Sequence, residues 1–260
     1  MILVDTHAHL DIEEFEKDRD EVIGRAVENG VAAIINASFD MESSYRSAAL
    51  AERHEMIYAL VGVHPHDADE VPENYLEQLE SLTKKRKVVA MGEMGLDYYR
   101  DLSPRAIQQK VFREQLALAR ELDIPVVIHD RDAHSDVMGI LKGDGIPKRG
   151  GVMHCYSGSW EMAREFMKMG FYISIAGPVT FPNAAKLKDI AVRLPVDRIL
   201  IETDCPYLAP QKWRGKRNEP AYVRYVAGEI AGLRGMPADD FARAASANAS
   251  AIFGISIPGL

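Results

Sequence analysis

Short apolar segments alternate with amphipathic segments along this 260-residue chain, and this alternation constrains the fold more than any other feature. Most of the apolar segments are rich in Val and Ile, which is typical of strands buried on both faces of a parallel sheet. We predict eight strands, at Ile2–Asp5, Val31–Ala37, Ile57–Val63, Val88–Glu93, Pro125–His129, Gly151–Cys155, Phe171–Ile175 and Arg198–Thr203.

The segments between the strands have the periodicity of amphipathic helices. Examples are Ile12–Asn29, Met41–Glu55, Pro104–Leu122 and Ser159–Met169, and the tail Ala221–Phe253 reads as two further helices. Ser103, and the run from Ser157 to Ser159 before Trp160, stand where N-caps would be expected. Eight strands with intervening helices predict an α/β fold, a (β/α)8 TIM barrel formed by residues 1–260 as a single domain. A doubly wound open sheet is the alternative.

The composition excludes several classes of protein. Hydrophobic residues make up 47% of the chain, which is enough for a large core. No apolar run is long enough to span a membrane. Only two cysteines occur, and we see no secretory signal, so we expect a reducing, cytoplasmic setting. The net charge of −8 argues against a general nucleic-acid coat protein but permits a nuclease with a locally positive site.

Polar residues collect at the carboxyl ends of the predicted strands, where the residues of a barrel converge on its active site. Six of the eight histidines fall at these ends. In an extended chain residues i and i+2 point the same way, so His7 and His9 can place both imidazoles on one metal ion. Glu93 and Asp204 end two further strands and add the carboxylates that a metal centre needs. We expect Glu93 to bridge two divalent ions and Asp204 to hold the attacking water as its base.

One further segment on the same side of the predicted barrel is basic. Four of the six residues from Lys212 to Arg217 are Lys or Arg, and Trp213 lies among them. Phosphate contacts and a stacking ring suit a single nucleic-acid strand. A mobile charged loop is the other interpretation.

Several motifs together resemble the TatD family of metal-dependent deoxyribonucleases, within the amidohydrolase-like barrels. They are His7-Ala8-His9-Leu10, Gly62-Val63-His64-Pro65-His66, Gly92-Glu93-Met94-Gly95-Leu96-Asp97-Tyr98, His154-Cys155-Tyr156-Ser157-Gly158, Glu202-Thr203-Asp204 with Pro206-Tyr207-Leu208, and Arg217-Asn218-Glu219-Pro220. The resemblance covers nearly the whole chain. Met94 and Cys205 are mild departures from the residues usual in the family, and neither is an expected ligand.

The resemblance implies a barrel with a two-metal site. One ion would be held by His7, His9, Glu93 and Asp204, and the second by Glu93, His129 and His154. His64 and Arg131 would lie close by, either supporting the metal ligands or contacting a phosphate. Trp213, Arg214 and Arg217 complete the expected substrate-binding residues. Mg²⁺, Mn²⁺ or Zn²⁺ would serve as the cofactor.

We therefore expect a hydrolase that cleaves DNA phosphodiester bonds by a water activated by two metals, as a 3'-5' exonuclease on single-stranded ends. No membrane and no obligate protein partner is expected. One rival is a metal-dependent amide or ester hydrolase acting on aminoacyl or peptide-like substrates, which would not need the basic segment 212–217. A second rival is a non-enzymatic metal or nucleic-acid binding protein, which would not need a base such as Asp204.

Overall fold

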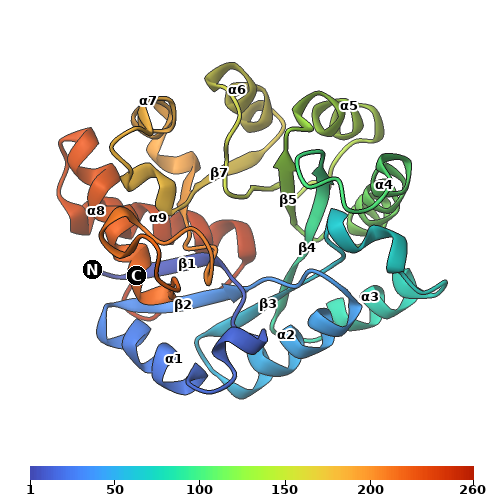
Figure 1. Ribbon diagram of the computed structural model, residues 1–260, viewed down its shortest axis with the longest axis horizontal. Coiled ribbons are helices and arrows are strands. Elements are labelled where there is room, and N and C mark those ends of the chain that lie inside the picture. Colours follow the sequence, from blue (N-terminus) through green and yellow to red (C-terminus); the bar gives the residue numbers. More distant parts are fainter. The chain divides into compact units, whose positions relative to one another are not determined.

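The computed structural model describes residues 1–260, and the contacts within it divide the chain into two compact units. Unit 1 consists of Met1–Asn36 and Ile173–Leu260, and unit 2 consists of Ala37–Tyr172. Figure 1 shows strands and helices alternating along the chain, each strand being followed by at least one helix. The prediction that residues 1–260 form a single domain stays a prediction.

Unit 1 contains the first two and the last two strands. Strand β1 pairs with β2 and β7 pairs with β8, both in parallel, and a bridge between Ala8 and Cys205 links the end of β1 to the segment after β8. The strands are β1 (Leu3–Ala8), β2 (Val31–Asn36), β7 (Phe171–Ile175, with Ile173 onward in this unit) and β8 (Ile199–Ile201). The helices are α1 (Arg19–Glu28), α7 (Ala185–Arg193), α8 (Val223–Arg234) and α9 (Ala238–Phe253).

Unit 2 contains the four middle strands. Strand β4 pairs in parallel with β3 and with β5, and β5 also pairs in parallel with β6. These strands are β3 (Ile57–Val61), β4 (Val88–Asp97), β5 (Val126–Arg131) and β6 (Gly151–Met153). The helices are α2 (Met41–Arg53), α3 (Tyr75–Thr83), α4 (Arg105–Leu122), α5 (His134–Asp144) and α6 (Trp160–Lys168). None of the helices in either unit is long and apolar enough to cross a membrane.

The observed strands lie at all eight predicted places. Their apolar side chains are almost entirely buried, as strands covered on both faces require. Strand β4 continues four residues beyond the predicted end at Glu93, to Asp97, and β1 continues to Ala8. These extensions carry polar side chains into the sheet, and an apolar pattern alone cannot indicate them.

Two predictions about helix starts were wrong. The first helix begins at Arg19 and not at Ile12, because a short 3-10 turn (η1, Glu13–Phe15) buries Phe15 before the helix starts. The N-cap position of α4 is Pro104, and the Ser103 hydroxyl instead donates a hydrogen bond to the carboxylate of Asp69 over 2.6 Å. The N-cap prediction for α6 is confirmed, because the Ser159 side chain accepts a hydrogen bond from the Met162 amide.

Candidate metal centre

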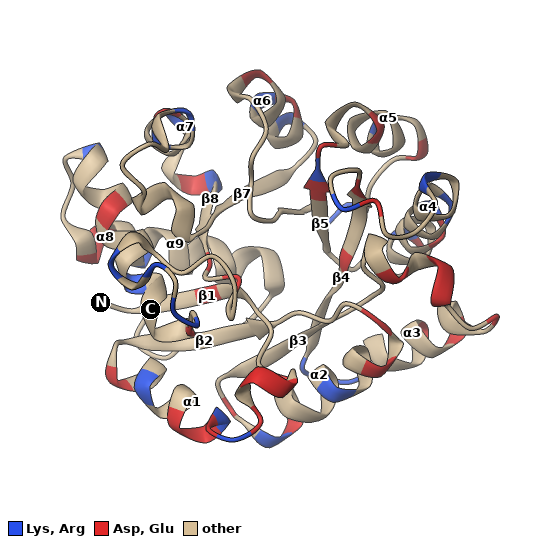
Figure 2. Cartoon of the chain, in the orientation of Figure 1, with Lys and Arg blue, Asp and Glu red and all other residues tan.

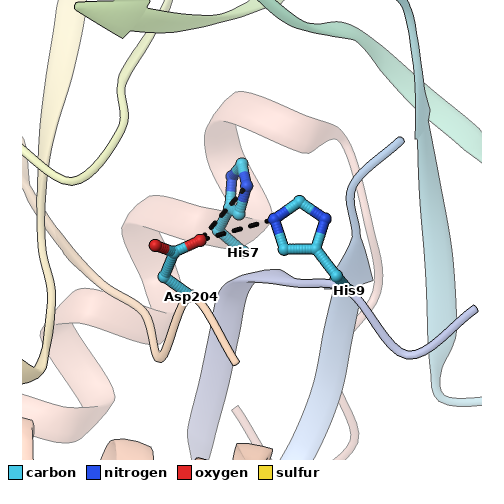
Figure 3. Close-up of side chains that lie close together, drawn as sticks. All are labelled: His7, His9 and Asp204. Atoms are coloured by element: carbon cyan, nitrogen blue, oxygen red, sulfur yellow. Dashed lines mark ion pairs between the residues drawn. The ribbon is translucent and has the colours of Figure 1, made fainter. Parts of the chain in front are cut away.

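In unit 1 two imidazoles meet one carboxylate at the end of β1. Nε2 of His9 lies 3.4 Å from Oδ1 of Asp204, and Nε2 of His7 lies 3.9 Å from the same atom. Figure 3 shows both rings turned toward this carboxylate. Their centroids are 5.0 Å apart, so the i, i+2 spacing does place both rings on one side of the chain. The His7 side chain is fully buried, that of His9 is 7% exposed and that of Asp204 is 14% exposed, so Asp204 is the most accessible residue of the cluster.

Backbone hydrogen bonds fix this arrangement. The Asp204 amide donates to the carbonyl of His7 over 2.9 Å, and the His9 amide donates to the carbonyl of Cys205 over 2.9 Å. Beneath them the buried Asp5 carboxylate accepts hydrogen bonds from the amide and the hydroxyl of Thr203, at 2.8 and 2.5 Å. Burial raises the pKa of Asp5 to about 8. Asp5 therefore connects the two segments that carry the cluster and is not itself exposed to a substrate.

In unit 2 three imidazoles surround one carboxylate oxygen. Oε1 of Glu93 lies 2.6 Å from Nδ1 of His129, 3.0 Å from Nε2 of His154 and 3.5 Å from Nε2 of His64. The sequence predicts all four at strand ends, and in the structure His64 and His154 follow β3 and β6, whereas Glu93 and His129 lie within β4 and β5. The side chains of Glu93 and His154 are each 4% exposed. The four residues that the sequence predicts on these strand ends therefore lie together.

Gly95 allows β4 and β5 to approach closely beside this cluster. It pairs with His129 in the sheet and has a φ of +146°, a backbone conformation that residues other than glycine rarely adopt. A Cβ atom at this position would overlap the carbonyl oxygen of His129. Glycine at this position lets Glu93 and His129 meet across neighbouring strands.

Asp97 is a member of this site to which the sequence analysis assigns no role. Its Oδ2 lies 3.0 Å from Nε2 of His129 and 2.9 Å from Nε2 of His66. Burial alone would raise the pKa of Asp97, but hydrogen bonds with these two histidines hold it well below its usual range. Burial alone would likewise lower the pKa of His129, but its bonds with Asp97 and Glu93 raise it. The only sequence signal was the position of Asp97 four residues after Glu93, which does not distinguish a supporting carboxylate from a surface acid.

One backbone hydrogen bond determines which ring nitrogen of His64 carries the proton. Its Nδ1 accepts a hydrogen bond from the backbone amide of His66 over 3.1 Å, so the proton of a neutral ring is on Nε2. Burial, followed by the nearby His129, lowers the pKa of His64 well below its usual value, which favours that neutral ring. His64 therefore offers a hydrogen-bond donor to the cluster and not a free nitrogen.

Two buried glutamines on α4 hold the backbone beside the cluster, and sequence reasoning missed both. The side chain of Gln115 accepts from the amide of Val63 and donates to its carbonyl, at 2.8 and 3.0 Å. The side chain of Gln108 accepts from the amide of Asp97 over 2.9 Å. Two glutamines seven residues apart on an otherwise apolar helix face were the available signal.

The chemistry of both clusters fits divalent cations. In each of the sets His7, His9, Asp204 and His64, Glu93, His129, one ring nitrogen or carboxylate oxygen of each residue lies within 4.8 Å of those of the other two. Imidazole nitrogens combined with carboxylate oxygens suit zinc and similar first-row ions. A histidine that ligates a metal usually donates its other N–H to a carboxylate, and Asp97 is placed to serve His129 in this way.

The basic segment 212–217 lies in the loop between β8 and α8 of unit 1, where its Lys and Arg are blue in Figure 2. Arg214 is exposed and lies over the ring of Phe181, 4.9 Å from its centroid. Arg217 forms a two-pronged ion pair with Asp18, with N–O distances of 2.8 and 2.5 Å. Of the predicted phosphate contacts in this loop, Arg214 is thus the more open to a ligand.

The other two predicted substrate contacts are aromatic or lie against an aromatic ring. Trp213 stacks on Tyr222 with a centroid distance of 4.8 Å and an interplanar angle of 1°, so one face of its ring is covered. In unit 2 the exposed Arg131 lies over the ring of Tyr99, 4.0 Å from its centroid, at the end of β5 and two residues beyond His129.

Residues 4–254 match a family model described as TatD related DNase. The chain is 49% identical, over 98% of its length and 100% of the relative's, to an uncharacterized metal-dependent hydrolase, YabD, of Bacillus subtilis. It is 37% identical to the 3'-5' ssDNA/RNA exonuclease TatD of Cronobacter sakazakii, over 92% of this chain and 93% of that protein. The crystal structure of YjjV, a TatD homologue of Escherichia coli K12, matches with a TM-score of 0.92 at 36% identity and covers 98% of both chains.

The match to a solved structure over nearly the whole chain confirms the predicted fold class, a (β/α)8 barrel of parallel strands and helices. The metal-dependent hydrolases among the relatives agree with the two clusters, which give this chain residues able to bind metal.

Proposed function

The chain belongs to the family of TatD-related DNases, and on this premise we propose that it hydrolyses the phosphodiester bonds of DNA, working 3' to 5' from single-stranded ends. The observation that carries the proposal is the pair of clusters in which histidine nitrogens surround the carboxylate oxygens of Asp204 and Glu93. The relative named as a 3'-5' ssDNA/RNA exonuclease supports the polarity and the single-stranded substrate.

In this proposal each cluster holds one divalent ion. His7, His9 and Asp204 hold the first, and Glu93, His129 and His154 hold the second. Bound divalent ions supply Lewis acidity, which polarises a phosphoryl group and eases the deprotonation of water. That Glu93 also bridges the two ions stays a prediction.

Asp204 is the residue proposed to orient the attacking water and accept its proton. Its side chain is the most exposed of the unit 1 cluster, and its backbone is fixed by the hydrogen bond to His7. A base must lie within hydrogen-bond reach of the proton that it accepts, and the partial exposure of the Asp204 carboxylate supports this role.

His64 is proposed to contact the phosphate. Its Nε2–H is a buried donor beside Glu93, and a phosphate oxygen is an acceptor of suitable chemistry. Arg131, Arg214 and Arg217 are proposed to neutralise flanking phosphates, and Trp213 to support a base through the face that Tyr222 does not cover. For Arg217 a phosphate would have to compete with Asp18.

The test is cleavage of end-labelled oligonucleotides by chelator-stripped protein to which Mg²⁺, Mn²⁺ or Zn²⁺ is returned. A 5'-labelled single strand should shorten stepwise, and a 3'-labelled strand should release labelled mononucleotide at once. Single-stranded RNA and blunt duplex DNA are run in parallel, together with a small amide substrate that an amidohydrolase would accept.

The variant Asp204→Asn keeps the shape of the side chain and removes the proton acceptor. Loss of a general base costs roughly 10²–10⁴ in rate. Asp197→Asn is the matched control, because that carboxylate is exposed and outside the cluster. Hydrolysis of the amide with no cleavage of any nucleic acid would refute the proposed function. Full activity of Asp204→Asn would refute the role proposed for Asp204 as the base.

A further inference from the structure

Tyr207 is the only exposed aromatic residue of unit 1, and it lies beside His9 of the His7, His9, Asp204 cluster. Its side chain is 55% exposed, whereas the other aromatic rings of the unit are buried or half-buried. Its ring centroid is 6.1 Å from that of His9, with the planes at 65°. The Tyr207 ring therefore packs edge-on against His9, a residue proposed to bind the metal, while much of the ring surface faces solvent.

The backbone beneath this ring is firmly held. The Tyr207 amide donates to the carbonyl of Asp204 over 2.9 Å. The buried Asn218 side chain donates to the carbonyls of Tyr207 and Thr203, at 2.6 and 2.8 Å. Exposing a large ring costs free energy when it could be buried, and a fixed exposed ring is well suited to a ligand with an apolar face.

The basic loop 212–217 supplies cations in the same unit, but the ring of its aromatic residue, Trp213, is already partly covered by other side chains. Trp213 stacks on Tyr222, and the ammonium group of Lys216 lies 5.4 Å from its ring centroid. Tyr207 has an exposed ring and lies three residues from Asp204 in the chain. Its ring contacts His9, which is proposed to bind the metal. Of the rings in unit 1 it is the one best placed for a group attached to a phosphate at the cluster.

We propose that Tyr207 stacks on the base of the terminal nucleotide when the phosphate of that nucleotide is at the His7, His9, Asp204 cluster. The inference rests on the proposed nuclease function and deepens it, because it makes the nucleobase part of what the site recognises. Base–aromatic stacking tolerates any base, since every base has a π-face, so the contact favours nucleotides over plain phosphodiesters without selecting a sequence.

The test combines a change in the enzyme with a change in the substrate. Oligonucleotides with a normal or an abasic terminal nucleotide are cleaved by the wild-type chain, by Tyr207→Ala and by Tyr207→Phe. With the normal strand Tyr207→Ala should lower kcat/KM roughly 5- to 150-fold, which corresponds to about 1–3 kcal/mol. The abasic strand should lower wild-type kcat/KM by a similar factor, and Tyr207→Ala should lose nothing further on it. Tyr207→Phe keeps the ring and should stay within about twofold of wild type.

Leu208→Ala is the matched control, because this neighbour is also exposed but has no π-face, and it should leave the ratio of the two substrates unchanged. Metal content and melting temperature are measured for each variant. If Tyr207→Ala does not fold, Tyr207→Leu retains apolar volume against His9 without an aromatic face and takes its place.

Two failures are distinguishable. A wild-type chain that cleaves no oligonucleotide with any metal refutes the proposed function and this inference with it. A wild-type chain that cleaves normal and abasic strands equally, or a Tyr207→Ala variant that loses the same factor on both, overturns the stacking inference alone.

Discussion

Replacing Asp97 by Asn should weaken metal binding at the unit 2 cluster without altering any proposed ligand. Oδ2 of Asp97 accepts the Nε2–H of His129 and of His66, at 3.0 and 2.9 Å. Oδ1 accepts the backbone amides of Tyr99 and Arg100, at 3.0 and 2.8 Å. An asparagine whose oxygen keeps the two backbone amides must turn its NH₂ group toward the histidines.

That NH₂ group changes the tautomer of His129. It needs an acceptor, so Nε2 of a neutral His129 would lose its proton and Nδ1 would gain one. Nδ1 is the nitrogen that faces Glu93 within the cluster, at 2.6 Å. A protonated nitrogen cannot bind a metal, and the carboxylate that would raise the basicity of the ring is also lost. Such supporting partners typically account for 10–100-fold in metal affinity, or about 1.4–2.7 kcal/mol.

The assay is a competition titration of Zn²⁺ or Mn²⁺ against a chromophoric chelator at a fixed neutral pH. One class of site should weaken 10–100-fold in Asp97→Asn, and the other should keep its affinity. Asp130→Asn is the matched control, because Asp130 also pairs with a histidine, His134, over 2.9 Å, but that histidine is outside the cluster. Equal affinity in Asp97→Asn and wild type, or an equal loss in Asp130→Asn, would show that Asp97 does not support the site through His129.

Variants at four other positions also have expected outcomes. His7→Ala should lower the metal stoichiometry measured by elemental analysis, whereas His54→Ala, which changes a histidine at the end of α2, should not. Arg214→Ala should make the salt dependence of single-stranded DNA binding shallower by about 0.7 in log K against log salt. Arg217→Ala should change this slope less and lower the melting temperature, because Asp18 loses one of its two ion-pair partners and keeps only the longer contact with Arg25. Burial, and then the charge of Asp40, raises the pKa of Asp67 from 3.8 to about 6, so the folded chain holds this proton more tightly than the unfolded chain. Stability is therefore lost as the pH rises from 4 through 6, and Asp67→Asn should raise the melting temperature at pH 8 but not at pH 4.

The sequence predicted the strands and the polar residues at their ends because both depend on local patterns. A short run of Val and Ile indicates a buried strand, and a histidine or acid directly after it must lie at the carboxyl edge of the sheet. His7, His9 and Asp204 could be placed together by this reasoning, and the structure brings them together. The first helix was placed too early because the apolar residues of η1 continue its period, although Phe15 is buried by a turn.

The supporting residues could not be predicted because their roles depend on pairings between distant segments. Asp97 meets His129 across 32 residues, and Arg217 meets Asp18 across 199. A carboxylate after a strand and an arginine in a basic loop look the same in the sequence whether they are paired or free. The tautomer of His64 depends likewise on one backbone amide, and residue type gives no sign of it.

The two aromatic residues Trp213 and Tyr207 after β8 differ in how much of each ring the fold covers. Composition favoured Trp213, because a tryptophan among cations is what a single nucleic-acid strand requires. In the fold, Tyr222 stacks on one face of the Trp213 ring, whereas Tyr207 is exposed beside His9. A ring already stacked within the protein has less surface to gain from a ligand than an exposed one, so the larger part of any stacking free energy should come from Tyr207. Cleavage of oligonucleotides with and without a terminal base by Trp213→Ala and by Tyr207→Ala would measure how much each ring contributes to stacking. A larger base-dependent loss of kcat/KM in Trp213→Ala would show that Trp213, and not Tyr207, contributes most.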